Sequence, residues 1–263
     1  MDLGLKGKVA LVAAASQGLG RAVAEEFAAE GASLILCARG MDKLNQACDS
    51  IRQTSGDDVL GVAGDLTRYD DIERIFHAGI DRFGSIDILV TNVGGPPAGQ
   101  FEALDRSAWD DAVRLLLNSV LDLTRLVLPG MKERRWGRIL NITSIAAKQP
   151  VANLILSNSL RAGITGFAKT LANEIAADGI TVNNIMPGYT RTERVEELAA
   201  SVAQKEGTTP DAIRARWEAE IPIGRLAEPR EFAALAAFLV SERASYITGS
   251  SIAVDGGWIK SVF

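Results

Sequence analysis

The sequence predicts an α/β protein in which a doubly wound, seven-stranded parallel sheet is covered by helices on both faces. Short apolar runs alternate with longer amphipathic segments along the whole chain, which is typical of such a sheet. A glycine-rich turn follows the first apolar run directly. No linker, repeat or low-complexity stretch divides the 263 residues, so they predict one domain over 1–263.

Seven apolar runs are short enough to be strands buried on both faces. We expect strands at Val9–Ala13, Ser33–Ala38, Val59–Ala63, Ile86–Thr91, Gly137–Ile142, Thr181–Met186 and Ser251–Val254. Apolar residues at helical spacing predict helices that include Leu19–Ala29, Asp70–Arg82, Ser107–Met131 and Leu154–Asp178. The last of these contains Gly163 and Gly166, which cost helix stability and therefore predict close packing against another backbone. A dimer formed through the helices Ser107–Met131 and Leu154–Asp178 would supply this packing.

The segment Tyr189–Pro222 differs from the rest of the chain because it is charged, rich in alanine and too long for a simple connection. We expect it to form a helical lid over a substrate cleft. The alternative is a helical insert on the surface with no part in catalysis.

Composition excludes several classes of function. A net charge of −5 and a pI near 5.1 argue against a general nucleic-acid surface. No apolar stretch approaches the roughly 18 residues of a membrane span, and the start MDLGLKGK shows no secretory signal, so we expect a soluble cytoplasmic protein. Cys37 and Cys48 lack a C-x-x-C spacing and are expected to be reduced packing residues. His77 is the only histidine and is expected at the surface, which argues against a metal centre.

The glycine turn predicts a phosphate site. Gly18 and Gly20 lie where strand becomes helix, so the backbone can approach an anion and the first helical N–H groups can bind it. An ordinary tight turn is the alternative. Arg39 directly follows the second apolar run, where a dinucleotide-binding protein places its ribose-reading residue. An arginine can pair with a 2′-phosphate, so we expect NADP(H) rather than NAD(H), unless Arg39 is merely solvated.

Five further motifs accompany the glycine turn: GDL at Gly64–Leu66, TNVGG at Thr91–Gly95, NITS at Asn141–Ser144, NNIMPGYTRT at Asn183–Thr192 and VDGGW at Val254–Trp258. In this order they resemble the short-chain dehydrogenase/reductase family over nearly the whole chain, and most closely its 3-oxoacyl-acyl-carrier-protein reductases. The resemblance implies a Rossmann-type fold and an oxidoreductase acting on CH–OH or C=O groups. It also implies a small-molecule substrate, which includes acyl thioesters, and a homotetramer or homodimer.

The resemblance also implies a set of cofactor-binding residues. Asp65 would bond the adenine amine, although in the bare sequence it is equally an N-cap for the next helix. Asn92 and Gly94 would lie under the adenosine ribose. Pro187, Gly188 and Thr192 would hold the nicotinamide carboxamide. The full expected set is Ala14, Ser16, Gln17, Gly18, Leu19, Gly20, Arg39, Asp65, Leu66, Asn92, Gly94, Arg161, Pro187, Gly188, Thr190 and Thr192.

The chain departs from the family at the catalytic set of asparagine, serine, tyrosine and lysine. Ser144 is retained, but Ser157 stands at the tyrosine position and Arg161 at the lysine position. The asparagine position falls on Leu116, with Asn118 two residues away on another helical face. In the glycine motif, Ala13 and Ala14 replace a threonine and a glycine; alanine is small enough to be tolerated at the second position.

These departures change the expected chemistry. An aliphatic hydroxyl is a far weaker acid than a phenol, so Ser157 cannot replace the tyrosine as proton donor. Arg161 keeps a positive charge one helical turn away, where it can hold the cofactor ribose or a substrate carboxylate or phosphate. The leading hypothesis is an enzyme whose proton comes from a water held by Ser157 and Ser144. Tyr189 and Lys148 are alternative donors.

Two other functions remain open at this point. The chain would also suit a nucleotide-binding protein or sensor that has lost catalysis. A reductase of C=C or C=N bonds would need no phenol, but the tyrosine and lysine spacing of the enoyl-reducing members is not visible around Ser144–Lys169.

Overall fold

The computed structural model describes residues 2–55 and 58–262, and within them seven parallel strands form one sheet. The strand order is β3-β2-β1-β4-β5-β6-β7, so the direction of winding reverses between β1 and β4. In such sheets ligands bind at the carboxyl ends of the strands beside this reversal. The strands are β1 Val9–Ala13, β2 Ser33–Ala38, β3 Val59–Ala63, β4 Ile88–Thr91, β5 Gly137–Ile142, β6 Ile180–Pro187 and β7 Ser251–Val254.

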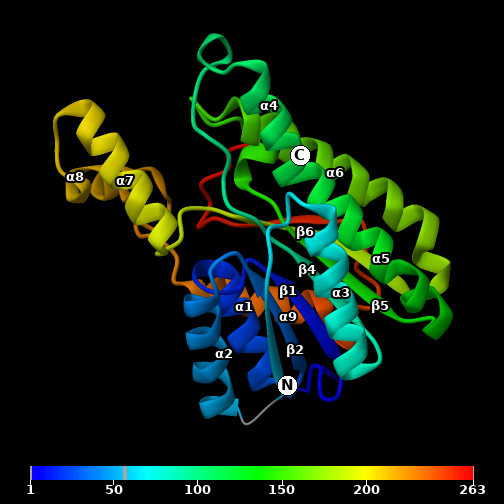
Figure 1. Cartoon of the computed structure of the whole chain (residues 1–263). Helices are drawn as coiled ribbons and strands as arrows, with labels where there is room; N and C mark the ends of the chain where they lie inside the picture. Colours follow the sequence, from blue (N-terminus) through cyan, green and yellow to red (C-terminus); the bar gives the residue numbers. More distant parts are fainter. Residues whose placement is uncertain (1, 56–57, 263) are drawn as a thin grey trace.

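Helices cover both faces of the sheet, which confirms the doubly wound prediction (Figure 1). One face carries α1 Gly18–Ala29, α2 Met41–Ser55 and α9 Pro229–Val240. The other carries α3 Tyr69–Phe83, α5 Ser119–Arg134 and α6 Ile155–Ile175.

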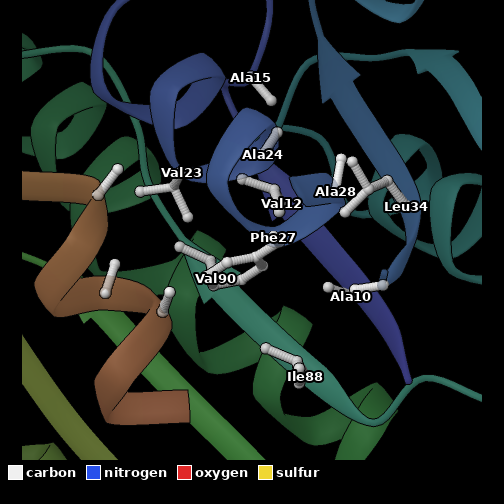
Figure 2. Close-up of a cluster of buried hydrophobic side chains, with 14 of the residues drawn as sticks. Ala10, Val12, Ala15, Val23, Ala24, Phe27, Ala28, Leu34, Ile88 and Val90 are labelled. Atoms are coloured by element: carbon white, nitrogen blue, oxygen red, sulfur yellow. The ribbon is translucent and has the colours of Figure 1, made fainter. Parts of the chain in front are cut away.

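The core beneath α1 holds the turn between β1 and α1 in place. All residues of β1 are buried, and Phe27 of α1 packs with Val90 of β4 and Val12 of β1 in one apolar cluster (Figure 2). Large side chains with no solvent exposure each contribute roughly 1.5–3 kcal/mol of burial free energy. The turn between β1 and α1 is therefore fixed at both of its ends.

Some predicted boundaries were wrong. β4 begins at Ile88 rather than Ile86, and the side chain of Asp87, just before the strand, accepts from the N–H of Val9 in β1 at 3.0 Å. The predicted helix Ser107–Met131 is divided into α4 Arg106–Val113, a π-helical turn at Arg114–Asn118 and α5. α6 ends at Ile175 and a 3₁₀ turn at Ala176–Asp178 follows it.

The segment predicted as a lid contains two helices, α7 Glu193–Glu206 and α8 Pro210–Glu220, which project from the rest of the molecule (Figure 1). They have a small core of their own, built from Ala199, Ala203, Ile213 and Trp217. Arg191 joins this unit to the body because it pairs with Glu218 of α8 at 3.0 Å and with Glu228, just before α9, at 3.3 Å.

Gly163 and Gly166 are exposed, and a Cβ placed on either would meet no atom within 4 Å. The close backbone packing expected for them is therefore absent from the described part of a single chain. His77 is exposed, as expected. Within residues 2–55 and 58–262, every helix is too short or too polar to cross a lipid bilayer.

Candidate active site

The turn between β1 and α1 is packed so tightly on itself that it requires glycine. A Cβ on Gly20 would lie 2.4 Å from the carbonyl oxygen of Ala14, so no larger residue fits without displacement. Gly18 has a φ of 59°, and Ala14 has a φ of 49° although it is not glycine. Ser16 and Leu19 are half-buried in the same turn.

The first N–H groups of α1 are open to a ligand. Gln17 is the N-cap, but its side chain makes no capping hydrogen bond. Helix N-termini left in this state bind anions through free N–H groups and the helix dipole. The start of α7 faces this turn, because a Cβ on Gly18 would lie 3.7 Å from the side chain of Thr192. Thr192 also caps its helix without a side-chain bond.

The end of β6 and the loop that follows β4 complete this region. Gly188 donates its N–H to Val254 at 2.9 Å, and a Cβ there would lie 2.7 Å from the Cα of Asp255. Pro187 ends β6, and Thr190 is buried with its hydroxyl 3.3 Å from the Gly188 carbonyl. The side chain of Asn92 lies against Gly20, and Gly94 is exposed over open space.

Asp65 closes a turn after β3 and is not the N-cap of α3, so that alternative was wrong. Its Oδ1 accepts from the N–H and the hydroxyl of Thr67 at 3.0 and 2.9 Å. The helix begins four residues later, at Tyr69. The turn leaves Oδ2 without a hydrogen bond in the described chain, and Leu66 beside it is buried.

Two cations, not one, lie at the end of β2. Arg39 is exposed directly after the strand. Lys43 of α2 reaches across to the glycine turn and donates to the Gln17 side chain at 2.9 Å. Lys43 is not among the cofactor residues expected from the sequence, where Arg39 alone supplied the positive charge. Lys43 lies in the first turn of the helix that follows β2, and this position is the sequence feature that could have identified it.

Ser144 and Ser157 come from adjoining elements. Ser144 follows β5 and accepts from the N–H of Ala146 at 3.1 Å, which fixes its side chain at the start of a 3₁₀ turn. α6 packs against that turn, and Ser157 lies in the first turn of α6 with 8% of its surface exposed. The Ser157 hydroxyl makes no hydrogen bond in the described chain. It is not fully enclosed either, since Thr124 Oγ1 is the sole enclosed side-chain polar atom without a partner in residues 2–55 and 58–262.

Arg161 is buried beside the end of β5. Its Nη1 donates to the carbonyls of Ile142 and Thr143 at 3.1 and 2.8 Å, and only 7% of the residue is exposed. Burial lowers the pKa of its guanidinium to about 10, which still leaves it protonated at neutral pH. The site therefore combines two hydroxyls and one fixed positive charge, a set that can stabilise negative charge on an oxygen.

The other residues considered for catalysis are placed less favourably. Leu116 is fully buried within the π-helical turn, and Asn118 is exposed. Lys148 is exposed. Tyr189 stacks on Trp217 with ring centroids 4.7 Å apart, and burial raises the pKa of its phenol. Tyr189 thus packs against the small core of α7 and α8 and is a poorer acid than an exposed tyrosine.

A cavity of about 670 Å³ lies between α1, the start of α7 and the start of α9. The cavity touches the glycine turn at Gly18 and the start of α7 at Thr192. Its lining includes none of Ser144, Ser157 and Arg161. The remaining lining residues are Arg21, Ala22, Glu25, Arg191, Glu193, Glu196, Glu197 and Pro229. This cavity is an open groove whose lining residues are mostly charged, and it lies outside the candidate catalytic centre.

Comparison with known proteins gives consistent matches over this fold. A family model described as enoyl-(acyl carrier protein) reductase matches residues 13–259. The 3-oxoacyl-[acyl-carrier-protein] reductase FabG of Vibrio cholerae is 36% identical over 255 residues, which are 97% of this chain and 98% of that protein. D-beta-hydroxybutyrate dehydrogenase of Cupriavidus necator is 35% identical and covers 97% and 99% of the two chains.

Solved structures are equally similar. L-Sorbose reductase from Gluconobacter frateurii, complexed with NADPH and L-sorbose, superposes with a TM-score of 0.95 and 36% identity over all of both chains. A variant of actinorhodin polyketide ketoreductase with NADPH gives a TM-score of 0.93 and 33% identity over 97% of this chain and 98% of that chain.

Proposed function

The chain belongs to the short-chain dehydrogenase/reductase family, and we propose that it is an NADP(H)-dependent oxidoreductase with a non-standard site of Ser144, Ser157 and Arg161. Its relatives by name interconvert CH–OH and C=O groups. We assign the same class of reaction to this chain. The observation that carries the proposal is the turn at Ala14–Gly20, which the sheet places two strands from Ser144.

The residues present fit a dinucleotide. Gly20 lets the tight turn between β1 and α1 form, because a Cβ there would clash with the Ala14 carbonyl, and the uncapped start of α1 offers N–H groups to a diphosphate. Arg39 and Lys43 supply positive charge where a 2′-phosphate would lie, which supports NADP(H) over NAD(H). The remaining cofactor contacts keep the roles that the family resemblance implies. Bound NADPH supplies a hydride to the substrate carbon.

The chain must then stabilise a negative oxygen and deliver a proton. Ser144 is held by Ala146 and can donate its hydroxyl to that oxygen. Because a serine side chain is shorter than a tyrosine, we propose that a water bonded to Ser157 and Ser144 takes the place that a phenol would fill. We assign the proton to this water. Loss of a positioned general acid costs about 10²–10⁴-fold in rate, so slow turnover is expected.

We further propose that α7 and α8 form a lid, in the segment 189–222, over a cleft for a small-molecule substrate such as an acyl thioester. The lid core is separate from the two sheet cores, so the unit can move as one body. Thr192 at the start of α7 lies beside Gly18, so a movement of the lid would be coupled to the turn between β1 and α1.

Substitution at the catalytic centre tests the assignment. Ser144→Ala should abolish NADPH consumption, and the double change Ser157→Tyr with Arg161→Lys should raise the rate of ordinary ketone reduction. Ser159→Ala, on the exposed side of α6, is the matched control and should leave the rate near that of wild type. If neither active-site change altered the rate while the control behaved as stated, the site would be wrongly assigned.

A second candidate function rests on the absence of a phenol at Ser157. On this alternative the protein binds the nucleotide as a structural ligand or sensor and does not oxidise it. Tight NADPH binding with no consumption across ketones, enones and imines would favour the alternative. Slow, saturable consumption of one of them would favour the enzyme.

A further inference from the structure

Arg161 is a buried cation without a counterion. Both of its hydrogen-bond partners are neutral backbone carbonyls, those of Ile142 and Thr143, and both engage the same nitrogen, Nη1. Burial alone shifts its pKa, with no contribution from a neighbouring charge. In the described chain no carboxylate forms an ion pair with it, whereas the other buried arginine, Arg138, pairs with Glu242 at 3.6 Å.

The remaining donors of Arg161 open onto accessible space. Nε and Nη2 make no hydrogen bond in residues 2–55 and 58–262, yet neither is among the fully enclosed atoms without a partner. Ser157, one helical turn earlier on the same face of α6, is likewise buried with a free hydroxyl that is not sealed off. The Nε and Nη2 groups of Arg161 and the Ser157 hydroxyl are therefore hydrogen-bond donors on one face of α6 that neither a protein partner nor complete enclosure removes from use.

A buried charge is costly unless an anion accompanies it, so this arrangement favours an anionic ligand over a neutral one. The cofactor diphosphate is badly placed to serve. It would lie at the turn after β1, whereas Arg161 bonds the end of β5, and β4 separates the two strands. Two strand spacings amount to roughly 10 Å. Ribose hydroxyls of the nicotinamide half could bond Arg161 but carry no charge.

We infer that the substrate is an oxo acid, a carbonyl compound whose own carboxylate is bound by the Nε and Nη2 groups of Arg161 with help from the Ser157 hydroxyl. A planar guanidinium binds a carboxylate through two parallel hydrogen bonds, which also fixes the orientation of the ligand. This inference rests on the proposed function and narrows its substrate class.

The reaction balances with the groups already assigned. Hydride would pass from NADPH to the carbonyl carbon, the C=O π bond would break, and the oxygen would take a proton from water. The hydroxide that remains takes a proton from the solvent, so the net reaction consumes one proton. The oxo acid is reduced to a hydroxy acid and NADPH is oxidised to NADP⁺. The carboxylate and Arg161 remain ionised throughout, so Arg161 binds and orients the substrate without transferring a proton.

The test uses two ketones of nearly equal shape, acetoacetate and its neutral methyl ester. Calorimetry on the full chain loaded with NADP⁺ measures binding without turnover, and NADPH oxidation gives KM for each ketone. We expect acetoacetate to bind at least about tenfold more tightly than the ester, because hydrogen bonds to charged groups are the stronger class. Arg161→Gln should bring the two affinities together, and Arg161→Lys should keep part of the preference. Arg106→Gln removes a surface arginine whose side chain is 94% exposed and should keep all of it.

The outcomes separate this inference from the function on which it rests. If neither NADP⁺ nor NADPH binds, both are wrong. If NADPH binds but wild type prefers neither ketone, the proposed function stands and the oxo-acid inference is overturned. A preference that survives in Arg161→Gln also overturns it, since the carboxylate would then lie elsewhere. The wild-type comparison decides even if the glutamine variant fails to fold.

Discussion

Two of the three side chains of the proposed site are held by backbone groups rather than by other side chains. Arg161 bonds two carbonyls at the end of β5, and Ser144 accepts from the N–H of Ala146. Motif spacing predicted Ser144, Ser157 and Arg161 as one site, and this assignment stays a prediction. Motif spacing was not enough to predict what binds each of them, because those partners belong to the backbone of elements packed in three dimensions.

Lys43 and Arg39 should together determine the choice of nucleotide. Both carry positive charge near the expected 2′-phosphate, and only NADPH has that group. Arg39→Ala and Lys43→Ala should each weaken NADPH binding by about tenfold, a modest effect because the site is exposed, and leave NADH binding nearly unchanged. Fluorescence titration with both nucleotides measures this. An equal loss for NADH would mean that the two residues stabilise the turn and do not read the phosphate.

Ala14 has a left-handed backbone that glycine adopts more easily. Its φ of 49° costs an L-residue about 1–2 kcal/mol in the folded state. Glycine avoids that cost, but its greater freedom in the unfolded chain lowers the free energy of unfolding by about 0.4–1 kcal/mol. Ala14→Gly should therefore raise the free energy of unfolding by about 0.5–1 kcal/mol in urea titration. Ala13→Gly in the buried strand β1 is the control and should be destabilising. A lower stability for Ala14→Gly would show that its conformation is not strained.

Among the elements, the strands were predicted best because a strand buried on both faces is a continuous apolar run with clear ends. The helix expected at Ser107–Met131 was predicted as unbroken, since one extra residue in a π-helical turn barely disturbs an apolar pattern. That turn carries Leu116, the position where the family has an asparagine. The two helices after Tyr189 were expected, but their separate core around Trp217 depends on contacts between them that no local pattern shows.

Helix α9 should show a pH dependence that originates at Glu231. Arg225 binds the Glu231 carboxylate through two hydrogen bonds of 2.7 Å, and the N–H of Glu228 donates to it as well. These contacts lower the pKa of Glu231 to about 2. A carboxylate whose pKa is lower in the folded state stabilises above its unfolded pKa and loses that effect as pH falls toward its folded value. The window is therefore from about pH 4.5 down to about 2.

Glu231→Gln should lower Tm at pH 7, and the difference from wild type should shrink steadily below pH 4.5. Thermal melts between pH 7 and pH 2.5 measure it. Glu133→Gln, which removes an exposed carboxylate of α5, serves as the comparison. A difference that stays constant with pH would place the effect of Glu231 in packing and not in its charge.

For the protein as a whole, the sequence predicted one doubly wound sheet with the correct number of strands, because the alternation of elements limits the possible topologies. Association between chains could not be derived in the same way. The expected homodimer or homotetramer depends on surfaces such as the exposed glycines of α6, whose partner would be another copy.

Gly166→Arg tests this association. If α6 packs against a second copy at its exposed glycines, a long charged side chain there should lower the apparent mass in light scattering toward one chain of 28.0 kDa. Lys205→Glu on α7 is a control for a surface change elsewhere. A monomeric wild type, or an unchanged mass for Gly166→Arg, would contradict a contact through this face.

Direct titration of the protein with NADPH examines the glycine turn on which the whole functional assignment depends. Calorimetry should show saturable binding of NADPH, at least about tenfold tighter than that of NADH. Gly20→Ala should weaken it by about tenfold or more, because the added Cβ would lie 2.4 Å from the Ala14 carbonyl and displace the turn. If wild type gave no heat of binding with NADPH or NADP⁺ at millimolar concentration, the account would be contradicted.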